Sequence, residues 1–400
     1  MRTAAGQLGR VGRRVGLAGA FALVLGAPGA LTAACSVYDP ALLPVARDAG
    51  PPDAGPSDAG EPRDAGPCNS RIPPPRPMIA DGPDVPEATF ALKDVVLDQG
   101  GDLWRSVGYN LDGLCSNAPD PVVECRPPRV SASLEVDGED GIDNSFGHNF
   151  YPLISVTLPT LEADARIAQE AGIGALVLRV RSWNGTGDDP RVDITVTQSV
   201  FGTPGDPDGG VPGGGDGGLP PVPDGGLRPP AWMGDDYFWG RDDTFLDGNP
   251  ERPRVRDDNA YVVGRLAVFR IPDRTEVLFT AREQGVLVRL TGGMATGTLS
   301  ADGQRIENVI IAGRWAITDM LETAERVGIC RGTTQYNIVS NLLDNASDVR
   351  STPGTGGEGV TCDALSLGVS FTGYRAHLAG IASAPALPNP CTLDAGVDGG

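Results

Sequence analysis

Apolar and polar residues alternate in short runs along most of the chain between residues 90 and 381. A period of two is typical of half-buried β-strands, whose successive side chains point to opposite faces of a sheet. Turn-forming residues separate these runs, so we expect a mostly β domain that folds as a two-sheet sandwich or a jelly roll. Strands are predicted at residues 90–97, 130–136, 153–158, 175–181, 192–200, 261–270, 277–280, 286–290, 297–299, 308–315, 365–371 and 374–381.

The pattern changes after residue 315. Ile317, Leu321, Ala324 and Val327 recur with helical spacing, and Gly328 follows as a stop signal. A second short helix is expected at residues 336–343. The domain should therefore carry one or two short helices near its C-terminal end.

Two segments of low complexity are expected to stay outside the hydrophobic core. Residues 48–67 repeat Asp-Ala-Gly with prolines between the copies, and residues 202–230 repeat Asp-Gly-Gly. With so few large apolar side chains, neither segment can offset the entropy lost on ordering, so both are predicted to be disordered. Four regions follow from this. They are a tether at 35–87, one β domain at 88–391 with a disordered insertion at 202–230, a loose tail at 392–400 and the leader at 1–34 described next. The alternative is that the insertion separates two domains.

The N-terminus has the features of an export signal. Four arginines between residues 2 and 14 precede an apolar run rich in Ala, Gly and Leu, which ends directly before Cys35. A basic start, a short apolar run and small residues before the cleavage point are typical of a signal peptide, which we assign to residues 1–34. A transmembrane anchor is the alternative, but Pro28 and several glycines interrupt the run, which only just reaches the length needed to span a bilayer.

The residues before Cys35 carry a second signal. The sequence Leu31-Thr32-Ala33-Ala34-Cys35 resembles the lipobox of bacterial lipoproteins, although the lipobox leucine normally stands where this chain has Thr32. With the Asp-Ala-Gly tether, this start resembles the surface lipoproteins inferred from GC-rich myxobacterial genomes, over the first quarter of the chain. The resemblance implies export and lipid attachment at Cys35, in the outer membrane or at the cell surface. A periplasmic or secreted protein is the alternative, and no activity is implied.

The chain has seven cysteines, an odd number. If Cys35 carries lipid, six remain, and an even set in an exported chain is typical of a disulfide framework. The framework cysteines are Cys68, Cys115, Cys125, Cys330, Cys362 and Cys391. Their spacing favours the pairs Cys115–Cys125, Cys330–Cys362 and Cys68–Cys391, although the sequence alone permits other pairings.

Composition and missing motifs argue against several function classes. The formal net charge is -20, so the chain should repel nucleic acids. It contains no Gly-x-Ser-x-Gly elbow, no phosphate-binding loop and no dinucleotide fingerprint, and its only histidines are His148 and His377. We therefore expect a protein without nucleic-acid partners and without catalytic activity.

An acidic segment at residues 137–147 is a candidate calcium site. Hard oxygen ligands at close spacing, with glycines between them, suit Ca²⁺, although the spacing is not that of an EF-hand. A solvated acidic turn is the alternative, and no other cofactor is expected. The candidate ligands are Asp137, Glu139, Asp140, Asp143 and Asn144.

A cluster of aromatic and acidic residues follows the insertion. Trp232, Asp235, Tyr237 and Trp239 could form a platform for a sugar ring, or supply the carboxylates of a glycosidase. The alternative, which we favour, is that these rings fill the core, since large aromatic side chains dominate protein cores. The chain is thus expected to be a surface-tethered, non-catalytic lipoprotein that binds a glycan or another envelope component. A secreted polysaccharide hydrolase using carboxylates and a purely structural envelope protein are the alternatives.

Overall fold

The computed structural model describes residues 70–79, 82–116, 122–129, 134–205, 228–281, 284–357, 359–383 and 390–393. The signal peptide, Cys35, Cys68, most of the tether, residues 206–227 of the insertion and most of the tail lie outside these ranges. The predictions made for those segments therefore stay predictions.

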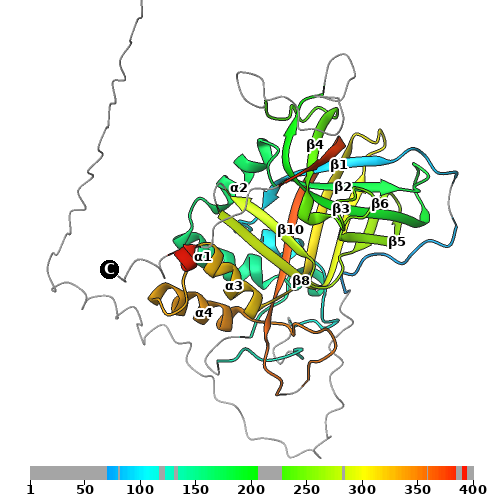
Figure 1. Ribbon diagram of the computed structural model, residues 1–400. Helices are drawn as coiled ribbons and strands as arrows, with labels where there is room; N and C mark the ends of the chain where they lie inside the picture. Colours follow the sequence, from blue (N-terminus) through cyan, green and yellow to red (C-terminus); the bar gives the residue numbers. More distant parts are fainter. Residues whose placement is uncertain are drawn as a thin grey trace, which may run out of the picture. The chain divides into compact units, whose positions relative to one another are not determined.

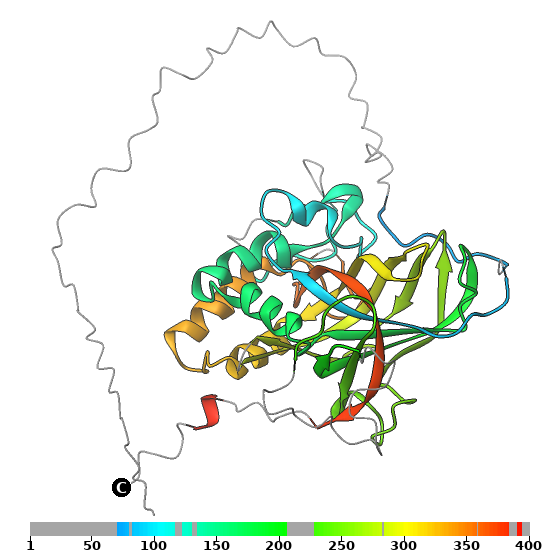
Figure 2. The same cartoon turned by 90° about the horizontal axis from the view of Figure 1, so that it is seen from above.

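Eight of the described strands close into an antiparallel barrel (Figures 1 and 2). Each strand pairs with the next in the order β1-β2-β3-β5-β6-β8-β9-β10, and β10 pairs back onto β1. The expected two-sheet sandwich or jelly roll is therefore wrong. The strands are β1 (Ala88–Val96), β2 (Leu176–Arg181), β3 (Asp189–Thr203), β5 (Val255–Val263), β6 (Leu266–Arg270), β8 (Gln284–Leu299), β9 (Arg305–Ala316) and β10 (Ala364–Ala382).

Two further strands extend the barrel. β4 (Asp236–Arg241) lies between β3 and β10, antiparallel to the first and parallel to the second. β7 (Glu276–Ala281) pairs with β8, away from the barrel ring. The two strands that flank the insertion, β3 and β4, are thus neighbours in one sheet.

Long, irregular strands explain the closure. β3, β8 and β10 contain 15, 16 and 19 residues, and the register of each shifts along its length. Such bulges bend a strand and increase its twist. The predicted strands at 286–290 and 297–299 are parts of β8, and those at 365–371 and 374–381 are parts of β10. The predicted strand at 261–270 is instead the β5–β6 hairpin, because Gly264 and Arg265 both adopt positive φ angles that form a tight turn.

Four helices lie together on one side of the barrel (Figure 1). α1 (Tyr151–Thr157) and α2 (Leu161–Glu170) precede β2, whereas α3 (Ile317–Arg326) and α4 (Thr334–Ala346) follow β9. A π-helical turn, η4 (Phe146–Phe150), leads into α1, and a short α5 (Pro390–Leu393) follows β10. None of the helices in the described part of the chain is long and apolar enough to cross a membrane.

The two C-terminal helices match the expected positions, but the first pair was not predicted. Residues 153–158 are expected to form a strand because they belong to the series of short alternating runs. They form α1 instead, since its helical turn buries Tyr151 and Ile154 together. α2 is rich in helix-forming residues and carries an ion pair between Glu162 and Arg166 one turn apart. The predicted strand at 130–136 lies partly outside the described residues, and residues 134–136 form no strand.

Disulfides join segments that are far apart in sequence. Cys125 is bonded to Cys362 and Cys330 to Cys391, so the pairs expected from sequence spacing are wrong. The first bond forms because residues 126 and 361, next to the two cysteines, form a β-bridge. Cys115 is also disulfide-bonded. Stable disulfides of this kind indicate an oxidising compartment, outside the cytoplasm.

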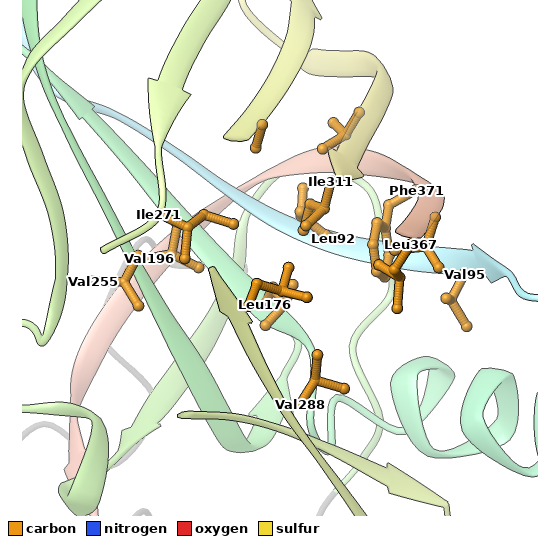
Figure 3. Close-up of a cluster of buried hydrophobic side chains, with 14 of the residues drawn as sticks. Leu92, Val95, Leu176, Val196, Val255, Ile271, Val288, Ile311, Leu367 and Phe371 are labelled. Carbon is orange, nitrogen blue, oxygen red and sulfur yellow. The ribbon is translucent and has the colours of Figure 1, made fainter. Parts of the chain in front are cut away.

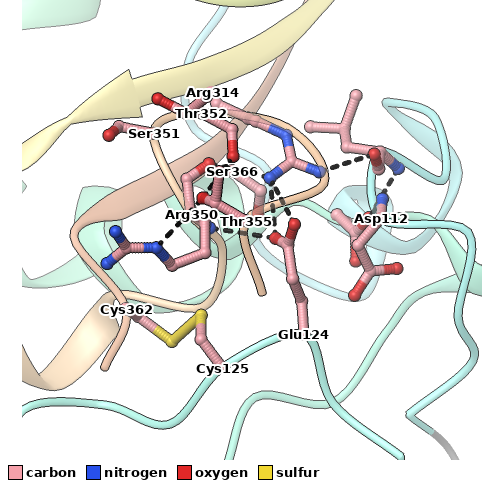
Figure 4. A network of polar contacts seen from close by, with 12 residues as sticks. Asp112, Glu124, Cys125, Arg314, Arg350, Ser351, Thr352, Thr355, Cys362 and Ser366 are labelled. Carbon is pink, nitrogen blue, oxygen red and sulfur yellow. Dashed lines mark hydrogen bonds and ion pairs between the residues drawn. A yellow bond between two sulfur atoms is a disulfide. The ribbon is translucent and has the colours of Figure 1, made fainter. Parts of the chain in front are cut away.

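A buried ion pair lies beside the first disulfide (Figure 4). The guanidinium of Arg314, on β9, donates to both carboxylate oxygens of Glu124 at 2.9 and 2.6 Å. It also donates to the carbonyl oxygens of Leu111 and Arg350, both at 2.7 Å. The side chains of Arg314 and Glu124 are 3% and 8% exposed, so this one cation anchors three loops to the barrel wall.

Candidate functional site

An apolar cavity of about 130 Å³ lies where the helices meet the barrel. Figure 3 shows part of its wall, with side chains from several strands directed toward one another. Alternation along the strands explains this convergence. Within each strand, the residues that line the cavity are two positions apart, so their side chains point to the same face of the sheet. These residues are Val286, Val288 and Leu290 in β8 and Leu367 and Val369 in β10.

The helices complete the wall of the apolar cavity. The side chains on this side of the cavity come from η4 (Phe146 and Phe150), α1 (Ile154), α2 (Ala165) and α3 (Met320). α4 adds one valine. The apolar cavity is thus bounded by barrel strands on one side and by helices from two separate parts of the chain on the other.

The cavity offers few polar groups. None of the described side chains that line it is charged. Thr275 and Thr323 already donate their hydroxyl protons to nearby backbone carbonyls. Burial, followed by the neighbouring carboxylates Glu162 and Asp98, raises the pKa of Tyr151 to about 12, so its hydroxyl stays neutral. Such a cavity excludes water and accepts apolar molecules, as an apolar cavity of roughly 150 Å³ accepts benzene.

Half-buried apolar side chains mark where the cavity approaches the surface. They come from the end of β1, the turn between α1 and α2, the β7–β8 hairpin and the end of α3. α2 packs directly against β7 at this point. These rim residues are Leu97, Leu158, Leu161, Val277, Val286 and Val327.

A second, much smaller hollow lies beside the Cys125–Cys362 disulfide. Its volume is about 10 Å³, and five carboxyl side chains line it. We call it the acidic hollow. Its carboxyl groups belong to Asp112, Glu135, Asp137, Asp143 and Asp348.

Burial raises the pKa values of four of these carboxyl groups, those of Asp112, Asp137, Asp143 and Asp348. It raises the pKa of Asp137 to about 6, with a further increase from the neighbouring Asp112. Burial also raises the pKa values of Asp143 and Asp348 well above the ordinary range, and the surrounding carboxylates add to both effects. Carboxyl groups in such a site bind protons more tightly than they would in water.

The acidic hollow contains two of the five predicted calcium ligands, Asp137 and Asp143. Glu139 and Asp140 are exposed outside it. Asn144 has a structural role, because its amide donates to the Gln99 side chain and to backbone carbonyls. Among the residues that the structure describes, no three His, Cys, Asp or Glu side chains are placed to hold a metal ion.

The predicted sugar platform is not assembled as one exposed surface. Trp232 and Trp239 are 7% and 3% exposed, and Trp239 stacks on Phe201 with 4.8 Å between ring centroids. The Trp232 indole Nε1 donates to the Glu170 carbonyl oxygen, within a cluster of buried apolar residues. Tyr237 is half-buried and Asp235 exposed. Both indoles therefore contribute to packing.

The apolar cavity is not recognisable in the amino-acid sequence. The residues that line it follow the same alternation as any core, so local patterns do not distinguish a filled interior from a hollow one. The one available signal is the presence of small residues, such as Ala165 and Ala324, on helix faces that are otherwise lined by larger apolar side chains. Comparison of the chain with protein-family models, curated proteins and solved structures finds no match.

Proposed function

We propose that this protein is a non-catalytic binding protein that holds a small apolar molecule, or one alkyl chain of a larger molecule, in the apolar cavity. The observation that carries the proposal is a cavity of about 130 Å³ with no charged side chain in its described lining. Eight-stranded barrels are of the size that either fills with side chains or encloses one small ligand. A mostly apolar pocket is the usual form of a small-molecule site.

Energetics support an occupant rather than a packing defect. Protein interiors are packed so closely that voids larger than a water molecule are rare. Unfilled space in a core costs roughly 24 cal/mol per Å³. An empty cavity of about 130 Å³ therefore costs about 3 kcal/mol of stability, which an apolar ligand would recover.

The proposed location is the outer membrane or cell surface, through lipid on Cys35. The disulfides support a compartment outside the cytoplasm, and the lipobox-like sequence supports the anchor. The test is the intact mass of protein extracted from membranes. We expect a chain that begins at Cys35 and carries lipid, and a Cys35→Ser variant that remains unprocessed. A soluble product that begins at another residue would contradict the anchor.

Binding is tested with a series of n-alkyl alcohols of increasing length. Each methylene that enters the cavity contributes about 0.8 kcal/mol, so the Kd should fall about fourfold per methylene. Once the cavity is full, the Kd should stop falling. Displacement of a fluorescent apolar probe measures both features. No saturable binding, or an affinity that increases without a plateau, would show that the alcohols only adsorb to the surface.

A further inference from the structure

α1 is apolar on both its inner and its outer face. Tyr151 and Ile154 are buried and line the apolar cavity, whereas Leu153 and Val156 are 48% and 80% exposed. A helix on the surface of a soluble domain normally has one apolar stripe and a polar outer face, and a helix that is apolar all round is normally buried. The outer face of α1 therefore has the chemistry of a buried surface, although no described part of the chain covers Val156.

The surroundings of α1 are also free of charge. No Asp, Glu, Lys or Arg occurs from residue 144 to residue 161, in a chain whose formal net charge is -20. The neighbouring helices differ, since α2 exposes Arg166 and Glu170 and α3 exposes Arg326. Charged groups lose much free energy when they leave water, and apolar groups gain. Among these three helices, α1 is thus the one whose outer face is best suited to contact with an apolar phase.

This outer face lies beside the mouth of the apolar cavity. Leu158 directly follows α1 and Leu161 begins α2, and both belong to the rim residues. Ile154, on the opposite face of the same helix, contributes to the cavity wall. α1 is thus part of the partition between the cavity and the outside. A surface that covers the outer face of α1 also lies next to the route by which an apolar molecule enters.

A lipid bilayer is the surface that fits this position. Its acyl chains are apolar and uncharged, so contact with α1 removes no charge from water. The proposed anchor at Cys35 also keeps the domain near a membrane. Residues 36–69 connect Cys35 to the described domain, and a flexible chain of about 34 residues spans about 30 Å on average. Such a linkage raises the effective concentration of the membrane, so a contact made by two side chains is sufficient.

We propose that the outer face of α1 rests on a lipid bilayer, with the mouth of the apolar cavity beside it, and that the cavity holds one acyl chain of a membrane lipid. This inference rests on the proposed function, because it names the ligand of the same cavity. An acyl chain that moves from the bilayer into the cavity exchanges one apolar environment for another. It therefore avoids exposing its methylene groups to water, which is the costly step for an apolar ligand.

Partitioning between water and vesicles tests the contact with the bilayer. The sample is the mature chain, residues 35–400, with Cys35→Ser so that no anchor contributes, and the vesicles consist of phosphatidylcholine. We expect binding in a flotation assay, and Val156→Ser should weaken it by about tenfold, because burying a valine side chain has about this effect on an equilibrium constant. Leu153→Ser should weaken it by several-fold. Since the contact is apolar, low and high salt should give similar partitioning.

Met233→Ser is the matched control. Met233 is 81% exposed, close to the value for Val156, but it lies before β4 and is not among the described residues that line the cavity. This variant should partition as the unsubstituted chain does. All three substitutions remove exposed side chains, so the variants should fold, and urea unfolding checks that they do.

A second measurement tests the identity of the ligand. Protein recovered from the vesicles is analysed for bound phosphatidylcholine by native mass spectrometry. We expect up to one lipid molecule per chain. Loading should be about tenfold slower for Val156→Ser, in proportion to its weaker partitioning, and unchanged for Met233→Ser.

The outcomes separate this inference from the proposed function. Absence of vesicle binding, equal losses for Val156→Ser and Met233→Ser, or binding that high salt abolishes would overturn the contact through α1. If the n-alkyl alcohols fill the cavity but the vesicles neither bind nor load lipid, only the present inference fails. If vesicles bind through α1 while neither alcohol nor lipid is retained, the contact with the bilayer is supported, and the proposed function fails together with the acyl-chain ligand.

Discussion

Filling the apolar cavity should stabilise the protein and block binding together. Ala165, on α2, is 4% exposed and lines the cavity. Ala165→Leu adds three carbon atoms to this space. At about 0.8 kcal/mol for each buried methylene, the gain is about 2 kcal/mol, within the limit of about 3 kcal/mol set by the whole cavity.

The same substitution should weaken binding of an apolar probe. If the leucine excludes three methylene equivalents of ligand, the Kd should rise by about 60-fold. Urea unfolding followed by tryptophan fluorescence measures the stability, and titration of the probe measures the Kd. Ala163→Leu is the matched control, because it makes the same chemical change on an exposed position of the same helix.

One result would refute the reasoning. A core that is already full responds to an added leucine with a loss of about 1–3 kcal/mol. If Ala165→Leu is destabilised by this amount and binds the probe as tightly as Ala163→Leu does, the space is not available to a ligand.

Three further predictions concern the framework around the cavity. Trp239→Ala should lower the free energy of unfolding by about 3–5 kcal/mol, because the buried indole stacks on Phe201; a loss well under 1 kcal/mol in urea unfolding would instead indicate an exposed binding platform. Glu124→Gln should cost about 3–5 kcal/mol in the same assay, because it leaves the buried Arg314 without its counter-charge, and an unchanged midpoint would contradict this view of the pair. Replacing both Cys125 and Cys362 with serine should cost about 5–6 kcal/mol in the chain-entropy model, because the bond spans 237 residues, and differential scanning calorimetry that shows no change in Tm would argue against it.

Alternation predicted strands well where one face of the strand is buried. β1, β2, β3 and β9 all lie close to their expected positions, because local periodicity reports burial directly. The arrangement of the strands could not be predicted in the same way. A sandwich and a barrel bury the same alternating residues, and only long-range pairings such as β1–β10 and β3–β5 distinguish them.

Tertiary packing overrode local preference at α1. Of the apolar residues that favoured a strand, Leu153 and Val156 are 48% and 80% exposed, and only Ile154 lies on the face of the helix that the fold buries in the core. The acidic hollow was recognised only in part for a related reason. Asp137 and Asp143 are close in sequence, so both belong to the predicted calcium site. Asp112 and Asp348 are far from them in sequence, and only the folded chain brings them to the hollow.

The pairing of β1 with β10 also determines when the protein can fold. Phe90 pairs with Arg375, so the barrel cannot close until nearly all of the described chain has emerged from the ribosome or from a translocation channel. Pairings over such a distance are slow to form. A chain that has to cross a membrane before folding benefits from this delay, because no closed barrel can block the channel. The same delay carries a hazard: until β10 arrives, β1 and β9 present unpaired edges, and unpaired edges are where incomplete β proteins aggregate.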